Sequence, residues 1–293
     1  MREILKITAN LLAICLVSAG LLGVIFIHTE AARHRNEEAR LAASMRRYLP
    51  PDAGRVQFSP IHRYLVEREG REPGVGYVLP TKSGHALMVL DPAGAVTDQI
   101  RLAGPLDTEA EREEALAHAL PGAKARFADT YILALGPDGR RLASFISGRT
   151  TGFKTWVKLL VALGPDNGVL GLEVLEHEED PGLGAEIEQE YFRNQFAGRT
   201  LEELASLGVV KLPLPDDYRR CLERSRWAER GLDAAKAGEL CASFAREGIH
   251  AITGATISSR RVTEGVKRLA GAFVRRMDMV QAAARSAGLE PAF

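Results

Sequence analysis

The stretch His250-Ala251-Ile252-Thr253-Gly254-Ala255-Thr256-Ile257-Ser258-Ser259 joins a loop of small residues to a helical pattern near the C-terminus. Gly254 and Ala255 leave the backbone open to close approach by a bulky group. Ser258 and Ser259 are residue types that cap helices, so we expect a helix to begin directly after them. The residues that follow predict its buried face, because they are apolar at three- and four-residue spacing: Val262, Val266, Leu269, Phe273, Met277 and Val280.

Thr256 is expected just ahead of this helix. Unpaired backbone N–H groups and the positive end of the helix dipole favour a phosphate at such a position. Clusters of Ser, Thr and Gly also open many helices that bind nothing. From the residues alone, the stretch is therefore either an anion site or an ordinary helix start.

The residues Thr253-Gly254-Ala255-Thr256 resemble the flavinylation motif of the FMN-binding domain family. This family includes the G subunit of the Rnf complex and the C subunit of the Na+-translocating NADH:quinone reductase. Its pattern is Asp-x-x-Ser/Thr-Gly-Ala-Ser/Thr, and the last hydroxyl carries FMN through a phosphoester bond that a flavin transferase installs. The resemblance implies that Thr256 is the attachment point and that Thr253, Gly254 and Ala255 lie in the cofactor site. His250 stands where the family has Asp, so an imidazole replaces a carboxylate in the motif that the transferase recognises.

A second informative stretch is His177-Glu178-Glu179-Asp180-Pro181-Gly182-Leu183-Gly184. Pro and two Gly predict a tight, irregular loop. Its acidic residues are typical of a solvated turn; a metal site is the other interpretation, although carboxylates adjacent in sequence rarely converge on one ion.

This stretch resembles the family's His-x-Glu-Thr-Pro-Gly-Leu-Gly, which implies a loop packed beside the flavin. His177, Glu179, Gly182 and Leu183 would then contribute to the FMN site. Asp180 stands where the family has Thr. If it lies near the flavin, its negative charge disfavours the anionic reduced forms and lowers the potential. Gly152-Phe153 likewise resembles a Gly-Tyr pair of the family.

The chain has 293 residues, a length that predicts about two domains besides any anchor. Lys+Arg and Asp+Glu both number 38, so no basic field points to nucleic acid. The sequence contains no Cys-x-x-Cys, Gly-x-Gly-x-x-Gly or Walker motif, which gives no support to iron–sulfur, c-type haem or those nucleotide sites. We assign no catalytic triad and no metal ligands.

Residues 7–27 carry no charge and are long enough to span a bilayer. A cleaved signal peptide is the alternative, but its apolar region is usually shorter and ends at a cleavage site. We therefore expect a retained single-pass anchor. The arginines after the span favour a cytoplasmic C-terminal side, whereas long domains translocate regardless of charge. The resemblance implies a bacterial inner-membrane protein whose soluble domain faces the periplasm.

Three pairs of apolar runs flank turn sequences and predict antiparallel hairpins. They lie at residues 85–90 with 95–102, 131–135 with 141–146, and 156–163 with 169–177. Helices are expected over residues 29–49, 107–120, 192–207 and within 218–247, and a short strand over 209–214. The fold class is therefore α+β: an N-terminal transmembrane helix, followed by a soluble domain with an antiparallel sheet and packed helices.

We divide the chain into a transmembrane anchor (1–28), a juxtamembrane helix (29–51), the N-terminal α/β part of the soluble domain (52–148), the FMN-binding domain (149–275) and a C-terminal tail (276–293). Cys221 and Cys241 lie in a charged helical region without a counterpart in short family members. They either form a disulfide, if the domain is periplasmic, or remain reduced.

Taken together, the resemblance implies an electron-transfer subunit with covalent FMN in an ion-translocating Rnf-type ferredoxin:NAD oxidoreductase complex. Such a chain is a redox subunit rather than a stand-alone enzyme. Its expected partners are the other subunits of a membrane redox complex and a flavin transferase. Two alternatives stay open: a flavin-free membrane-tethered sensor or assembly module, and a flavoprotein of another periplasmic reductase chain.

Overall fold

The computed structural model describes residues 1–82, 84–244 and 247–293, and it divides into two units, Met1–Arg47 and Tyr48–Phe293. The first unit is one helix, α1 (Arg2–Arg47), which continues without a break from the expected span into the expected juxtamembrane segment. Within the described residues, its portion Arg2–Phe26 is the one helix long and apolar enough to cross a membrane. The predicted fold class, with an apolar N-terminal helix ahead of an antiparallel-sheet domain, is confirmed.

An eight-stranded sheet organises the second unit. Its order is β4-β3-β2-β1-β5-β6-β7-β8, and all of these pairs are antiparallel. The strands are β1 (Gln57–Glu67), β2 (Gly74–Thr81), β3 (Gly84–Leu90), β4 (Val96–Leu102), β5 (Lys124–Leu135), β6 (Arg141–Thr151), β7 (Trp156–Leu163) and β8 (Val169–Glu176). The three predicted hairpins are confirmed as β3–β4, β5–β6 and β7–β8, whereas β1 and β2 were not predicted. The proposed boundary between residues 148 and 149 falls inside β6.

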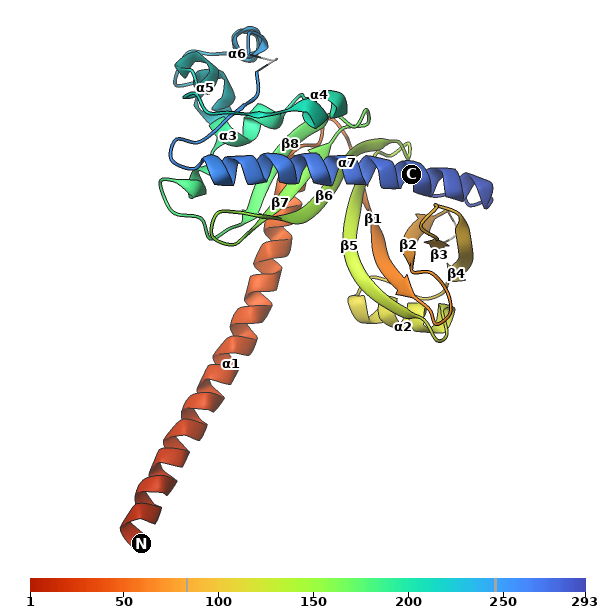
Figure 1. The fold of residues 1–293 in the computed structure, drawn as a ribbon, viewed down its shortest axis with the longest axis vertical. Helices are drawn as coiled ribbons and strands as arrows, with labels where there is room; N and C mark the ends of the chain where they lie inside the picture. The colour runs from red at the N-terminus through yellow and green to blue at the C-terminus, as the bar shows by residue number, and fades with distance from the viewer. Residues whose placement is uncertain (83, 245–246) are drawn as a thin grey trace. The chain divides into compact units, whose positions relative to one another are not determined.

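Helices cover both faces of this sheet (Figure 1). Alternate residues of β2 separate the two cores: Tyr77 and Leu79 belong to the core that includes α7 (Thr256–Ser286), and Val78 belongs to the core that includes α2 (Glu109–Ala119). This alternation follows from the two-residue period of a strand. The helix α7 therefore covers one face of the sheet and α2 the other.

The long helix α7 lies unusually close to β6 because glycines occupy the contact. A Cβ at Gly148 would lie 2.3 Å from Leu269 Cδ2, and one at Gly265 would lie 2.8 Å from Thr150 Cβ. Thr150 Oγ1 also donates to the Arg261 carbonyl at 3.0 Å. These contacts fix the N-terminal half of α7 against the sheet. The helix continues to Ser286, through much of the segment proposed as a C-terminal tail.

Shorter elements connect β8 to α7. They are α3 (Glu190–Arg193), α4 (Leu201–Ser206), α5 (Asp216–Leu222), α6 (Ala234–Ala242) and three 3₁₀ turns (Gly184–Glu188, Asn194–Phe196 and Arg224–Arg226). The strand expected over residues 209–214 is limited to β9 (Val209–Val210), which pairs in parallel with β10 (Ile249–His250). Pro213 removes a backbone donor and ends the strand pattern. Cys221 and Cys241 form a disulfide between α5 and α6.

Candidate functional site

The helix α7 begins at Thr256 itself, so the predicted caps at Ser258 and Ser259 are wrong. Ala255 occupies the cap position, with no side-chain cap bond. Ser259 Oγ accepts from Ile252 N at 3.0 Å and donates to the Ala255 carbonyl at 2.9 Å. Its hydroxyl therefore hydrogen-bonds the preceding loop to the first turn of the helix, and Ser259 lies inside the helix instead of at the cap position.

Thr256 consequently occupies the first helical position. The first helical backbone bond beyond the cap runs from Ser259 N to the Ala255 carbonyl. The N–H groups of Thr256, Ile257 and Ser258 precede it, as in any helix start. The Thr256 side chain is half-buried and Thr253 is exposed. This geometry is compatible with both interpretations of the stretch, an anion site or an ordinary helix start.

Gly254 lets two loops meet beside Thr256. Its φ of +79° lies in the left-handed region that favours glycine. A Cβ added there would lie 2.9 Å from Leu183 Cδ2, so the 177–184 loop packs directly on the 251–255 loop. The two motifs that the sequence singled out, which lie far apart along the chain, therefore form one site.

A buried carboxylate, that of Glu179, ties three segments together at this point; its residue is 6% exposed. Glu179 Oε1 accepts from Phe153 N at 2.6 Å and Lys154 N at 3.2 Å. Its Oε2 accepts from Ser258 Oγ at 2.5 Å. The β6–β7 turn, the 177–184 loop and the first turn of α7 thus share one acceptor, which orients them relative to Thr256.

Two glycines make room for this carboxylate. A Cβ at Gly152 would lie 2.2 Å from Glu179 Oε1, and one at Gly184 would lie 2.4 Å from Glu179 Oε2. Sequence reasoning named both glycines as parts of motifs but missed this role, and it missed Ser258 as the partner of Glu179. The sequence signal that could have indicated this packing is an acidic residue, Glu179, in one motif together with a glycine in each of two motifs, Gly152 and Gly184.

His177 holds the loop rather than facing solvent. Its Nδ1 accepts from Glu179 N at 3.0 Å, and its Nε2 lies 3.0 Å from Glu188 Oε1. An N–H on Nε2 satisfies both contacts. His177 therefore supports Glu179 from within the loop.

Asp180 forms an ion pair with Lys154, and this pairing raises the pKa of Lys154. We expected Asp180 to lower the flavin potential on the basis of its own negative charge, without the positive charge of a partner. A paired carboxylate has a weaker field at a nearby group than an isolated one, because the two charges oppose each other. Lys154 was not identified from the sequence.

Large apolar side chains remain exposed on the segments joined by Glu179. Phe153 is 62% exposed, Leu183 45% and Ile257 51%, and Trp156 at the start of β7 is 59% exposed. Sequence analysis named Phe153 and Leu183 from motif resemblance and missed Trp156 and Ile257. Such exposed apolar groups around a polar anchor position are suited to a flat aromatic ligand.

His250, the first residue of the motif stretch, does not face this site. It is 4% exposed and its ring contacts the segment between β9 and β10. As for metals, no cluster of three or more His, Cys, Asp or Glu side chains able to hold an ion occurs within residues 1–82, 84–244 and 247–293. The site therefore offers backbone donors, a buried carboxylate and apolar surface.

Comparison with known proteins finds a similarity over the part of the chain that carries this site. Residues 152–271 match the family model of the FMN-binding domain. The G subunit of the proton-translocating ferredoxin:NAD(+) oxidoreductase complex from Clostridium ljungdahlii is 33% identical over 72 residues. That alignment covers 25% of this chain and 37% of the relative, so it spans little more than a third of the relative's length.

Two solved structures align over larger parts of the chain. The C subunit of the Na(+)-translocating NADH-quinone reductase from Parabacteroides distasonis aligns over 60% of this chain and 71% of its own, with 18% identity and a TM-score of 0.34. NqrC from Shewanella oneidensis aligns over 74% and 78%, with 16% identity and a TM-score of 0.36. The similarity to the FMN-binding domain rests on the family match.

Proposed function

Because residues 152–271 match the family model of the FMN-binding domain, we propose that the chain is a membrane-anchored electron carrier with FMN bound covalently to Thr256. The single observation that supports the proposal best is the position of Thr256. It is the first residue of α7 and is half-buried. Glu179 of the 177–184 loop binds both the β6–β7 turn and the first turn of this helix.

Attachment requires one new phosphoester bond. Thr256 Oγ1 would form this bond to the phosphate of FMN supplied as FAD. The anhydride bond to the adenylate half would break, AMP would be the leaving group, and the hydroxyl proton would pass to the transferase or to solvent. The backbone N–H groups at the start of α7 favour the resulting phosphate charge, because they form the positive end of the helix dipole.

The exposed apolar side chains are proposed as the seat of the isoalloxazine ring. Phe153, Leu183 and Ile257 come from three segments that meet at Glu179 and Gly254. When bound, FMN supplies a ring that accepts one or two electrons and passes them on. The chain's own contribution is to bind this ring, exclude water from one side and fix its orientation.

The proposed setting is the outer side of a bacterial inner membrane, within an Rnf-type complex. The apolar segment Arg2–Phe26 supports an anchor. The Cys221–Cys241 disulfide supports an oxidising compartment, because disulfides persist there and are rare in the cytosol. Similarity to one component of the Clostridium ljungdahlii complex supports partner subunits. A flavin transferase for maturation is part of the proposal because covalent attachment requires one.

The test is visible absorbance of the full-length protein after co-expression with a flavin transferase, before and after denaturation. We expect a flavin spectrum that stays with denatured wild-type protein, bleaches on chemical reduction and returns on reoxidation. Thr256→Ala should be colourless after denaturation. Flavin that washes out on denaturation would refute covalent attachment, and absence of flavin despite an active transferase would favour the sensor or assembly module.

A further inference from the structure

Residues 211–244 and 247–248 lie between β9 and β10, immediately before the flavin motif, and we call these residues the insert. Val209 pairs with Ile249 and Val210 with His250. Gly248 allows this approach, because a Cβ there would lie 2.7 Å from the Gly208 carbonyl oxygen. The last residue of β10 is thus also the first residue of the motif stretch.

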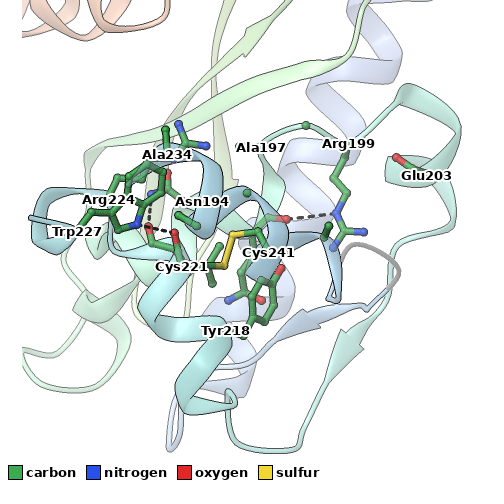
Figure 2. Close-up of a pocket in the computed structure, with 16 residues that line it drawn as sticks. Asn194, Ala197, Arg199, Glu203, Tyr218, Cys221, Arg224, Trp227, Ala234 and Cys241 are labelled. Carbon is green, nitrogen blue, oxygen red and sulfur yellow. Dashed lines mark hydrogen bonds between the residues drawn. A yellow bond between two sulfur atoms is a disulfide. The ribbon is translucent and has the colours of Figure 1, made fainter. Parts of the chain in front are cut away.

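The described part of the insert has its own small core around the disulfide (Figure 2). Tyr218, Cys221 and Leu222 are buried. The Tyr218 ring stacks on Phe244, near Cys241, with centroids 4.7 Å apart. The disulfide therefore holds together the two sides of an aromatic pair.

His250 contacts this core directly. Its ring meets Tyr218 edge-to-face with centroids 6.0 Å apart. Its Nδ1 lies 3.2 Å from the Leu212 carbonyl oxygen, and its Nε2 lies 2.5 Å from Glu247 Oε2. The insert therefore surrounds the His250 side chain with one aromatic ring and two oxygen acceptors.

The main chain of His250 is fixed from the opposite side. Gln195 Oε1 accepts from His250 N at 2.7 Å, and Gln195 Nε2 donates to the His250 carbonyl at 3.3 Å. Both Gln195 and His250 are buried. His250 is thus a fixed junction, with its backbone held by the domain and its side chain held by the insert.

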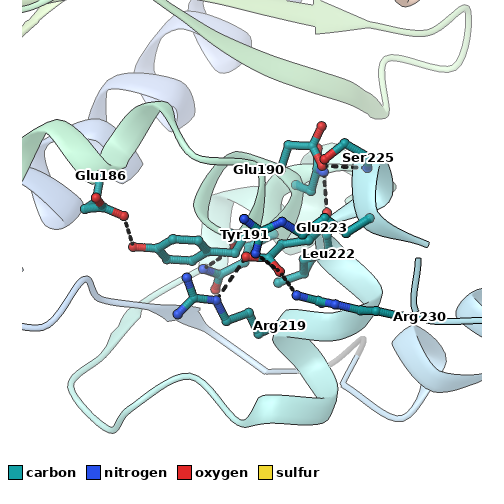
Figure 3. Close-up of polar contacts among 11 residues, drawn as sticks. Glu186, Glu190, Tyr191, Arg219, Leu222, Glu223, Ser225 and Arg230 are labelled. Atoms are coloured by element: carbon teal, nitrogen blue, oxygen red, sulfur yellow. Dashed lines mark hydrogen bonds and ion pairs between the residues drawn. The ribbon is translucent and has the colours of Figure 1, made fainter. Parts of the chain in front are cut away.

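The insert is also anchored on α3, as Figure 3 shows. Arg219 lies over the Tyr191 ring at 4.4 Å, and Ser225 N donates to Glu190 at 2.9 Å. Burial favours the neutral form of Glu223, yet hydrogen bonds from Arg219 and Arg230 lower its pKa. These contacts fix the orientation of the insert relative to α3. Because the insert also contacts His250, it restricts the position of the 251–255 loop that follows.

The chemistry of the His250 pocket explains why His and not Asp fits here. The Leu212 carbonyl and a Glu247 carboxylate oxygen can only accept a hydrogen bond. A neutral imidazole has one N–H, which it can donate to either of these acceptors, whereas a carboxylate has none. An Asp carboxylate would face two acceptors without a proton to share, which is unfavourable in a buried site.

We propose that His250 is a positioning residue through which the disulfide-closed insert holds the 251–255 loop, and with it Thr256, in the geometry that the flavin transferase requires. This inference rests on the proposed function for its link to flavin. The positioning itself is a property of the unmodified protein. In this chain, the contacts between the insert and His250 thereby take the place of the contacts of a carboxylate at position 250.

The first test compares two isosteric variants, His250→Asn and His250→Asp, in the full-length protein. Asn can donate to the Leu212 carbonyl and Asp cannot. We expect His250→Asn to be modified within about threefold of the wild-type rate, and His250→Asp to lose about tenfold or more, because a carboxylate at this position has no proton to donate to the Leu212 carbonyl oxygen and would lie against the Glu247 carboxylate. If His250→Asp is modified as fast as wild type or faster, the proposal is wrong.

The second test removes the crosslink with the double variant Cys221→Ser/Cys241→Ser, and uses Cys15→Ser as the matched control. Amide hydrogen exchange of residues 249–257 is measured in protein made without transferase. We expect exchange to rise about tenfold or more in the double variant and to match wild type in the control, because losing a disulfide loosens the segments it joins. Unchanged exchange in the double variant would refute the positioning role.

The two readouts separate this proposal from the proposed function. If wild-type protein is never flavinylated, covalent attachment fails, and hydrogen exchange in the His250 and cysteine variants still decides whether the insert orders the loop. Circular dichroism identifies any variant that has lost its global fold. If a variant has lost its fold, Tyr218→Phe and Tyr218→Ala are measured in its place. The proposal requires slow hydrogen exchange of residues 249–257 in Tyr218→Phe and faster exchange in Tyr218→Ala.

Discussion

Ser258 donates its hydroxyl hydrogen bond to Glu179 Oε2 across 2.5 Å, although 79 positions separate the two residues in the sequence. Both residues are buried, and the other oxygen of the carboxylate accepts two backbone N–H groups of the β6–β7 turn. One acidic side chain therefore closes a site built from three distant segments. This hydrogen bond links the two motif-bearing segments directly.

Replacing Ser258 with Ala should destabilise the protein by about 1.5–3 kcal/mol, because a hydrogen bond to a charged group is lost in a buried position. Urea unfolding of the full-length protein in detergent measures the change. Ser286→Ala on the same helix is the control, because Ser286 is exposed and its hydroxyl donates only to the Ala282 carbonyl. Equal stability of the two variants would show that the Glu179 contact contributes nothing.

The glycines of α7 should respond to Ala in opposite directions. Gly265→Ala places a Cβ 2.8 Å from Thr150 Cβ and should cost about 1–2 kcal/mol through overpacking. Gly271→Ala meets only the end of the Arg275 side chain at 3.2 Å and should stabilise by up to about 1 kcal/mol through helix propensity. Thermal unfolding of both variants tests the prediction, and a stabilising Gly265→Ala would contradict the close packing of α7 on β6.

His62 should make folding sensitive to acid. Burial, and then the charges of Arg112 and His85, lower its pKa from 6.5 to about 4. Because the unfolded chain binds the proton more readily, its contribution to stability is complete above pH 6.5 and is lost as the pH falls from 6.5 toward 4.

The variant His62→Gln should therefore lose less stability than wild type between about pH 7.5 and about pH 4.5. Exposed His118→Gln is the control for the effect of a His-to-Gln substitution as such. Denaturant midpoints at the two pH values provide the measurement. Identical pH dependence of wild type and His62→Gln would contradict the assigned role.

The proposed ring seat predicts a difference between two exposed phenylalanines. Phe153→Ala should make the bound flavin more accessible to iodide, with a quenching constant about twofold to tenfold higher, because an aromatic contact of about 0.5–1.5 kcal/mol is lost. Phe127→Ala, which removes a 42% exposed ring on β5, should leave quenching unchanged. Equal quenching in all three proteins would place the ring elsewhere.

The hairpins were predictable because their turn chemistry is local. Asp91-Pro92-Ala93-Gly94 and Gly136-Pro137-Asp138-Gly139 specify turns within a few residues, and the structure has strands on both sides of each. The strand β1 was not predicted: it contains Pro60, and polar residues such as His62 interrupt its apolar pattern. Its pairing with β5 depends on chain segments that lie far apart in the sequence, which no local pattern reveals.

In the candidate site, too, local sequence features were predictable and contacts between distant segments were not. Motif resemblance pointed to Thr256 and to the 177–184 loop, and the structure places Gly254, beside Thr256 in the chain, against Leu183 of that loop. The partner of Glu179 could not be predicted, because Ser258 matches a capping pattern equally well. The disulfide also required three-dimensional information: two cysteines 20 residues apart are compatible with either state, and only the packing of α5 on α6 brings their Cα atoms to 5.7 Å.

The most direct test of the account is intact-mass spectrometry of the full-length protein, co-expressed with a flavin transferase, in three forms: wild type, Thr256→Val and Thr253→Val. Both substitutions remove one hydroxyl from the same motif and keep the side-chain shape. We predict the mass of one phosphoester-linked FMN on wild type and on Thr253→Val, and none on Thr256→Val. An FMN adduct on Thr256→Val, or no adduct on wild type under a transferase that modifies another substrate protein, would contradict Thr256 as the site of attachment.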